Sequence, residues 1–190
     1  MKWKIMMLIG FLLILTGCSE RTALTAADIV VELNNRPLEQ FETIAQLPFT
    51  VHLDVSETEI ETDTYQLSLE LTLLNSEEMV REVQVTAVLP DDLREYFVTG
   101  EPQLPFSNHF DIEEEMREYF ILTPSDDQTI QVQVERPLKQ RLTDEDVDEI
   151  TKQLEKIKLK LTYVTESNDV TVHYVTLSSE SIHVGDRVAE

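Results

Sequence analysis

Apolar and polar residues alternate over several short segments of the chain, beginning near residue 49. The apolar members of the first three runs are Phe49, Val51, Leu53 and Val55; Tyr65, Leu67, Leu69, Leu71 and Leu73; and Val83, Val85, Ala87 and Leu89. Further strand-like segments lie at residues 118–122, 130–135, 159–164 and 170–177. A period of two sends alternate side chains to opposite faces of a strand, which is typical of half-buried strands in antiparallel sheets.

The number of these segments favours two sheets packed face to face. About seven short strands separated by turn residues predict a mainly β protein, an antiparallel immunoglobulin-like β-sandwich in outline. The Trp and Cys residues of antibody domains are absent from this part of the chain, so the prediction concerns the architecture alone. A rolled-up barrel is the alternative. In either case, residues 48–190 are enough for a single domain.

One segment has a helical period instead. Thr143 is a suitable N-cap, and acidic residues at 144–146 fill the first turn, where the helix dipole favours them. The apolar residues that recur at spacings of three and four are Val147, Ile150, Leu154 and Ile157. This pattern predicts one amphipathic helix over residues 143–157, packed on a sheet and followed directly by a strand.

The residues before the first alternating run are less regular. Residues 19–27 are small or polar and show no periodicity, so they predict a flexible tether. Pro37, followed by Leu38, Phe41 and Ile44, suggests a short helix. We therefore assign residues 18–47 to a tether that includes a short helix.

The first twenty residues have the order of a secretory signal. Lys2 and Lys4 precede an apolar run at residues 5–15, and small residues then lead to Cys18. The apolar run is 11 residues long, whereas a helix that crosses the bilayer needs about 20. A retained transmembrane anchor is therefore the poorer interpretation.

The tetrapeptide Leu15-Thr16-Gly17-Cys18 resembles the lipobox of bacterial lipoproteins. The resemblance implies a signal peptide at residues 1–17, cleavage before Cys18 and diacylglycerol on the Cys18 thiol. It also implies attachment to the extracytoplasmic face of the cell membrane, where two acyl chains hold a protein stably. The resemblance covers the N-terminus alone and indicates no family for the mature domain.

The composition is strongly acidic and poor in cysteine. The chain carries 37 Asp plus Glu against 15 Lys plus Arg, a formal net charge of −22. Such a surface repels phosphate backbones and anionic headgroups, so we expect no nucleic-acid partner. Cys18 is the only cysteine, which leaves no other thiol for a disulfide, a nucleophile or a metal. An acidic exported domain of this kind favours the wall-facing membrane of a Gram-positive cell.

Metal and catalytic chemistry find little support in the sequence. The weak calcium candidates are the alternating acids Glu57, Glu59, Glu61 and Asp63. They lack the spaced acids and the turn glycine of an EF-hand loop. The four histidines are dispersed, and the chain contains no HExxH, GxSxG or SxxK motif and no glycine-rich phosphate loop. We therefore predict no cofactor, no metal site beyond that weak candidate, and no catalytic residue.

A long connection at residues 90–115 is the strongest candidate for a contact site. Residues 91–96 suggest a short helical turn, and the candidate partner-contact residues that follow are Phe106, Asn108, His109 and Phe110. Long loops on sandwiches often carry binding function, and exposed aromatic side chains make good anchors. In the alternative interpretation, the two phenylalanines tuck beneath the loop and cap the core.

These features together predict a lipid-anchored extracytoplasmic lipoprotein that acts as a non-catalytic protein-interaction module at the cell envelope. Its partners would be the membrane, through Cys18, and another envelope protein. Two alternatives stay open: a lipoprotein that binds a small molecule, a sugar or calcium, and a hydrolase of envelope polymers. A deep pocket with convergent polar groups would favour the first, and a cleft with paired carboxylates or a Ser–His contact would favour the second.

Overall fold

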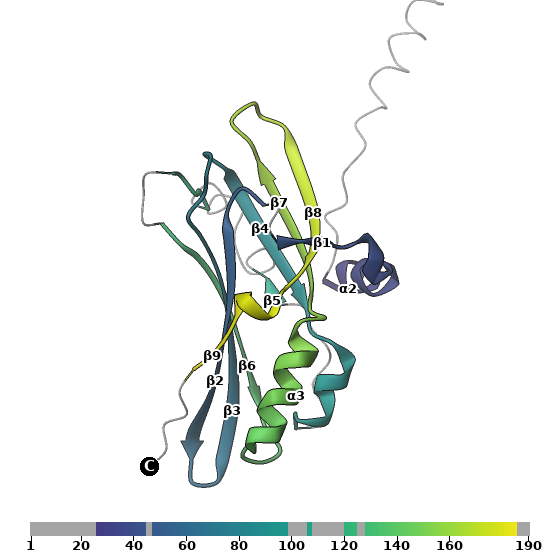
Figure 1. Cartoon of the computed structure of the whole chain (residues 1–190), viewed down its shortest axis with the longest axis vertical. Coiled ribbons are helices and arrows are strands. Elements are labelled where there is room, and N and C mark those ends of the chain that lie inside the picture. The colour runs from purple at the N-terminus through teal and green to yellow at the C-terminus, as the bar shows by residue number, and fades with distance from the viewer. Residues whose placement is uncertain (1–25, 45–46, 99–105, 108–119, 125–127, 186–190) are drawn as a thin grey trace, which may run out of the picture.

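The computed structural model describes residues 26–44, 47–98, 106–107, 120–124 and 128–185 (Figure 1). The helical elements are α2 (Ala26–Asn35), η2 (Leu38–Gln40), η4 (Asp91–Glu95), α3 (Asp144–Leu154) and η6 (Ser179–Ser181). The strands are β1 (Glu42–Thr43), β2 (Thr50–Glu61), β3 (Thr64–Leu74), β4 (Arg81–Val88), β5 (Phe106–Ser107), β6 (Ile130–Pro137), β7 (Lys158–Val164), β8 (Val170–Thr176) and β9 (Ile182–Val184). The alternating runs of the sequence therefore form strands, as predicted.

The strands form two sheets of a sandwich-like, mainly β fold. One sheet has five strands in the order β1-β8-β7-β4-β5, and the other has four in the order β6-β3-β2-β9. Antiparallel pairing dominates both sheets. The two exceptions are at the edges, where β1 runs parallel to β8 and β9 runs parallel to β2.

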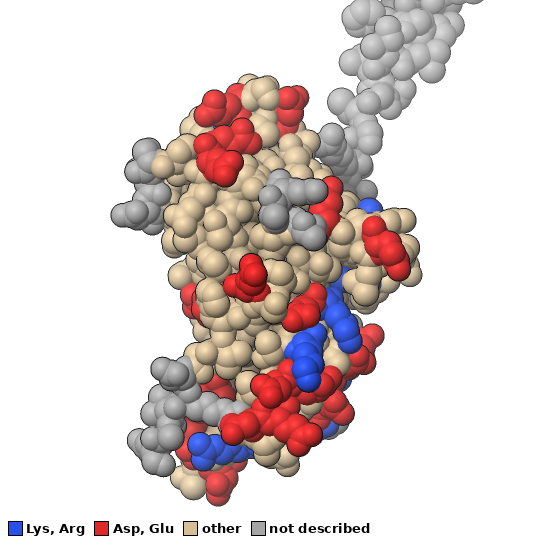
Figure 2. All heavy atoms as spheres, viewed as in Figure 1, with Lys and Arg blue, Asp and Glu red and all other residues tan. Residues whose placement is uncertain are grey.

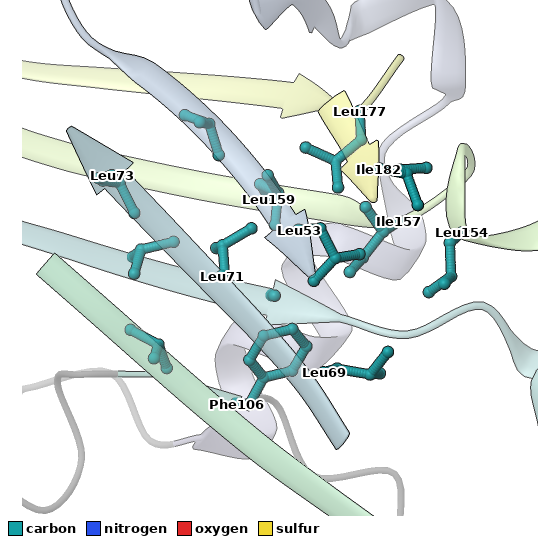
Figure 3. Close-up of a cluster of buried hydrophobic side chains, with 14 of the residues drawn as sticks. Leu53, Leu69, Leu71, Leu73, Phe106, Leu154, Ile157, Leu159, Leu177 and Ile182 are labelled. Carbon is teal, nitrogen blue, oxygen red and sulfur yellow. The ribbon is translucent and has the colours of Figure 1, made fainter. Parts of the chain in front are cut away.

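The core lies between the two sheets and is built from the inward positions of the alternating runs. In the register of β2 and β3, Leu53 is opposite Leu71 and Val55 is opposite Leu69, and all four side chains are buried. Leucines and isoleucines from both sheets and from α3 gather in this core (Figure 3). Burying one such side chain fully stabilises the fold by about 1.5–3 kcal/mol.

Helix α3 confirms the predicted amphipathic helix, although it is shorter at its C-terminal end. Thr143 and Asp146 form a capping box: the Asp146 amide donates to the Thr143 hydroxyl at 3.2 Å, and the Thr143 amide donates to the Asp146 carboxylate at 2.8 Å. The helix ends at Leu154 rather than at residue 157. Ile157 still reaches the core, because a turn in which its amide donates to the Leu154 carbonyl (3.0 Å) brings it there.

Helix α2 lies within residues 18–47, which the sequence predicts to be a tether with a short helix near Pro37. Residues 26–35 are helical, whereas the helix suggested around Pro37 is only the short η2 turn, followed by strand β1. Proline disfavours a helical conformation in the residue before it, so α2 ends ahead of Pro37 instead of starting there. The helix forms because Ile29 and Leu33, one turn apart, are both buried against the sheet.

The connection after β4 is partly described. The predicted helical turn is present as η4. The strand expected at residues 118–122 is represented by Leu122, which forms an isolated antiparallel bridge with Val80. Residues 118 and 119 lie outside the described part of the chain.

Candidate interaction surface

The structure describes one of the four predicted partner-contact residues. Phe106 is 5% exposed, pairs with Ala87 through β5 and β4, and packs among core leucines (Figure 3). Its side chain therefore follows the core-capping interpretation and is not an exposed anchor, because burial removes more apolar area from water. Asn108, His109 and Phe110 lie outside the described residues, as does Cys18.

The weak calcium candidates lie at the far end of the β2–β3 hairpin. Glu57, Glu59 and Glu61 are on β2, and Asp63 occupies the turn with φ 60°. Two of the four carboxylates serve local structure: Glu57 accepts a hydrogen bond from the Leu142 amide at 2.7 Å, and Glu59 accepts one from the Asp63 amide at 3.1 Å. Among the described residues, no three His, Cys, Asp or Glu side chains converge in a way that could hold a metal ion.

His173 forms a chain of hydrogen bonds between strands. Its Nδ1 atom is 2.8 Å from the Glu42 carboxylate, so Nδ1 carries the proton. In the neutral ring, Nε2 then accepts from the Tyr163 hydroxyl at 3.1 Å. Burial, followed by the charges of Glu78 and Glu42, raises the pKa of Tyr163, which keeps this hydroxyl protonated. The chain joins β1, β7 and β8, and a tyrosine held protonated in the core is a poor nucleophile.

A pair of histidines lies on the outer surface of the four-stranded sheet. The rings of His52 and His183 stack with centroids 4.9 Å apart, and His183 Nδ1 is 3.5 Å from the Asp54 carboxylate. These contacts join β9 to β2, the strand beside it. They explain how a strand of three residues is held at the sheet edge.

Two hollows on the described surface have volumes of about 250 Å³ or more. One of about 290 Å³ is lined by Glu95, Tyr96, Lys139, Gln140, Leu142 and Asp146. The Asp146 carboxylate is already engaged in the α3 capping box, and Lys139 donates to the Glu95 carbonyl at 2.6 Å. Burial, followed by nearby carboxylates that include Glu95 and Asp146, raises the pKa of Tyr96, so the phenol is not available as a base. The other, of about 250 Å³, lies beside Phe49.

The outer face of the five-stranded sheet is more distinctive, and helix α2 covers one part of it. Ile29 and Leu33 of α2 are buried against Val88 of β4. Lys158 of β7 reaches the C-terminal end of the helix, where Nζ donates to the carbonyl oxygens of Leu33 (2.9 Å), Asn34 (3.2 Å) and Arg36 (3.3 Å). A lysine in this position satisfies carbonyl groups that a helix end leaves unpaired.

A cluster of charged and aromatic side chains fixes the other side of α2. Lys160 Nζ is 2.7 Å from the Glu32 carboxylate, which also accepts a hydrogen bond from the Tyr174 hydroxyl. The Arg36 guanidinium lies 3.5 Å above the centre of the Tyr174 ring, and Phe41 meets the same ring edge-on. Burial alone would raise the pKa of Glu32, but the hydrogen bonds from Lys160 and Tyr174 and the charges of Lys160 and Arg36 outweigh it and lower the pKa below 4.5.

Beyond α2, the same outer face carries exposed valines. Val170 and Val172 of β8 are 62% and 43% exposed. In the β7–β8 register, Val170 is opposite Val164 and Val172 is opposite Thr162, so these four side chains share the outer face. We call Val164, Val170 and Val172 the outer valine patch. Among the described residues, the other exposed large apolar side chains lie in other segments of the chain: Val31, Leu38, Ile60, Val98 and Val184.

The strand that carries these valines also has an unpaired side. β1 pairs with β8 only at Val175 and Thr176. In the described ranges, no strand pairs with the backbone of residues 170–174 on the side away from β7. We call this unpaired backbone the β8 edge. The sequence pattern predicts the strand but does not by itself indicate this surface. A signal was present: Val170, Val172 and Tyr174 occupy one face while Val175 and Leu177 occupy the other, so the strand is apolar on both faces.

Within the described residues, no helix is long and apolar enough to span a membrane. No protein-family model matches the chain, and no curated protein matches its sequence.

Proposed function

We propose that this protein is a lipid-anchored extracytoplasmic lipoprotein, and that its domain is a non-catalytic interaction module that binds another protein of the cell envelope. The observation that carries the proposal is the outer valine patch beside the unpaired β8 edge. Contiguous exposed apolar side chains on a soluble domain mark contact sites more often than isolated ones do. The capping box, the histidine contacts and the anchors of α2, by contrast, are engaged in local structure.

The N-terminal sequence supports the anchor. The motif Leu15-Thr16-Gly17-Cys18 provides the lipid attachment site, and α2 begins at Ala26, eight residues after Cys18. A fully extended tether of that length spans at most about 28 Å. The five-stranded sheet, against which α2 docks, is thus held close to the outer leaflet. The acidic composition favours a Gram-positive cell surface and disfavours direct contact with anionic headgroups.

The immunoglobulin-like topology is also part of this proposal, and the strand order supports it. In immunoglobulin domains, strands A, B and E share one sheet and strands C, F and G share the other. When β2, β3, β4, β6, β7 and β8 take the roles A, B, C, E, F and G in chain order, the observed orders β6-β3-β2 and β4-β7-β8 become E-B-A and C-F-G. β1, β5 and β9 are then additional edge strands. This architecture is common among cell-surface domains.

In-cell photo-crosslinking of the full lipidated chain tests the function. A photoreactive amino acid replaces Val172, and the matched control carries it in place of Gln133, on the outer face of the other sheet. We expect one envelope protein to crosslink through position 172, and we expect that product to disappear when Cys18→Ala removes the anchor. Equal products from both positions, or no protein product from position 172, would contradict an interaction module that uses this face.

A further inference from the structure

We infer that the β8 edge binds an extended segment of the partner protein, which joins the five-stranded sheet as an added strand and carries basic residues on both sides of an apolar, β-branched centre. This inference rests on the proposed function and specifies how the partner binds. Addition of a strand to an exposed sheet edge is a recurrent form of peptide recognition, in which backbone hydrogen bonds provide affinity and alternate side chains provide specificity.

In the described part of the chain, the β8 edge lacks the protection found at the other sheet edges. Proteins guard edge strands by making them short or by adding prolines and charged side chains. β5 and β9 have two and three residues. β6 ends with Glu135, Arg136 and Pro137, and the Val98 amide donates to the Pro137 carbonyl at 3.0 Å. Residues 170–174 contain no proline and no Asp, Glu, Lys or Arg.

Two exposed valines lie beside this edge. Val170 and Val172 project to the outer face and are 62% and 43% exposed. A strand added next to β8 would place its own outward side chains beside these two valines, because neighbouring strands lie about 4.8 Å apart. Apolar or β-branched residues at alternate positions of the incoming segment would cover both valines and the adjacent Val164. The edge and the patch therefore form one continuous site.

Acidic side chains lie at both ends of the edge. Glu166 and Asp169 precede it in the β7–β8 turn, and the Glu42 carboxylate lies at its other end, bonded to His173. Three cations lie near these ends and are already engaged: Arg81 hydrogen-bonds to Asn168 at the turn, and at the other end Arg36 lies over the Tyr174 ring and Lys160 pairs with Glu32. Figure 2 shows acidic side chains gathered at the end of the molecule that holds the β7–β8 hairpin, above a largely uncharged region. Basic residues on both sides of an uncharged centre complement this arrangement.

The same charges decide against two other occupants. A second copy paired antiparallel through its own β8 edge would bring the Asp169 end of one chain to the Glu42 end of the other, and like charges opposite each other destabilise a strand pair. The chain's own residues 19–25 contain one acid, Glu20, and one base, Arg21. That segment has no net charge to offer two acidic ends. A basic segment from another protein is the better match.

A synthetic peptide tests the inference on the full lipidated chain in detergent micelles. The probe has a core of alternating valine and threonine with lysines at both ends, and it is compared with the same peptide carrying glutamates in place of the lysines. We expect the lysine peptide to bind and to slow amide hydrogen exchange in residues 170–174. N-methylation of the backbone groups on one side of the peptide should weaken binding by at least about tenfold, since those groups supply the hydrogen bonds.

Two protein variants complete the test. Val172→Lys should weaken binding of the lysine peptide by about tenfold or more, whereas Gln133→Lys, the matched change on the other outer face, should leave binding unchanged. Both positions face solvent, and a thermal unfolding curve verifies that each variant folds. Equal binding of the lysine, glutamate and N-methylated peptides would overturn the inference, as would exchange in residues 170–174 that no peptide alters.

The outcomes also separate this inference from the proposed function. If crosslinking through position 172 captures an envelope protein but N-methylation has no effect on peptide binding, the module binds by its face and strand addition is wrong. If the apparent mass of the free chain doubles and Val172→Lys restores a monomer, the occupant is a second copy. If residues 170–174 are already protected and lose that protection when residues 19–25 are replaced by glycine and serine, the occupant is the tether. Each of these results overturns the inference.

Discussion

The outer faces of the two sheets differ in how their side chains meet the solvent. On the four-stranded sheet, polar side chains pair across strands: Gln131 donates to Glu70 at 2.9 Å, and Gln133 donates to Ser68 at 2.9 Å. This face needs no cover, because its exposed side chains are solvated. The five-stranded sheet has apolar outer positions, such as Val170 and Val172, beside polar ones, and helix α2 covers only part of this face. We propose that another molecule covers the apolar part that no described segment covers.

Strand β7 shows where the cover ends. Its outward positions run from Lys158 and Lys160, beneath α2, to Thr162 and Val164, beyond it. The lysines lie under the helix because their ammonium groups bond to its last carbonyls and to Glu32, while their methylene stems pack on the sheet. The valine lies where the chain supplies no described cover. On this strand the charged residues are therefore covered by the helix, whereas the apolar Val164 lies beyond it; a strand on a plain solvated face would show the opposite arrangement.

The largest expected effect is the loss of the apolar contact beneath α2. Leu33→Ala should reduce the free energy of unfolding by about 2–5 kcal/mol, because Leu33 is fully buried and its truncation leaves a cavity. Chemical denaturation measures the loss, and hydrogen exchange identifies whether α2 alone is released. Val31→Ala, on the exposed side of the same helix, is the control and should stay within about 0.5 kcal/mol. Equal losses for both variants would mean that α2 is not docked as described.

The polar anchor of the same helix gives the next effect. Lys158→Met keeps most of the stem but removes the hydrogen bonds to three carbonyl groups at the end of α2, so we expect a loss of about 1–3 kcal/mol. Denaturation of the full chain measures it. Lys152→Met on the exposed surface of α3 serves as the matched control, because exposed ion pairs such as its contact with Glu149 contribute little. An unchanged stability for Lys158→Met would show that water replaces the anchor without cost.

How much of this could be predicted from the sequence depends on how local the signal is. The strands from β2 to β8 with clear alternation and the capped helix α3 were predicted because each pattern lies within its own segment. The docking of α2 could not be predicted in this way. Ile29 and Leu33 become a contact surface only when β4 and β7 lie side by side, and Lys158, which caps the helix, is 125 residues away from Leu33.

The candidate site had a similar limit. Phe106 was predicted as a possible contact residue because it lies in a long connection, but a two-residue strand beside β4 carries it into the core. Val170 and Val172 looked like ordinary strand residues. Their exposure follows from the position of β8 near a sheet edge and from how far α2 extends over the outer face, and neither fact is written in one segment of the chain.

The dependence of α2 docking on pH gives a smaller effect. The lowered pKa of Glu32 contributes stability that is complete above 4.5 and is lost as the pH falls through the folded-state pKa. Burial, followed by the hydrogen bond to Glu32 and the charge of Glu32, outweighs the effect of Arg36 and raises the pKa of Tyr174 above 10.0. The stability that the protonated phenol contributes is therefore complete below 10.0 and is lost as the pH rises through the folded-state pKa. Glu32→Gln should remove the acid-side loss, and Tyr174→Phe the alkaline one, each about 1 kcal/mol. Hydrogen exchange in α2 as a function of pH measures both, and an unchanged acid profile in Glu32→Gln would contradict this assignment.

The last two variants should change stability least, and they therefore distinguish an effect on binding from an effect on folding. Val172→Thr and Gln133→Ala alter one exposed side chain on each outer face, and we expect both to change the free energy of unfolding by no more than about 0.5 kcal/mol. Only Val172→Thr should lower the yield of the partner captured by a photoreactive residue at position 170, because it replaces a methyl group with a hydroxyl in the patch that we propose the partner covers. If the yield falls equally in both variants, the two faces do not differ in function. If the yield falls in neither variant, the exposed valines contribute neither to folding nor to partner binding, and they are not a binding site.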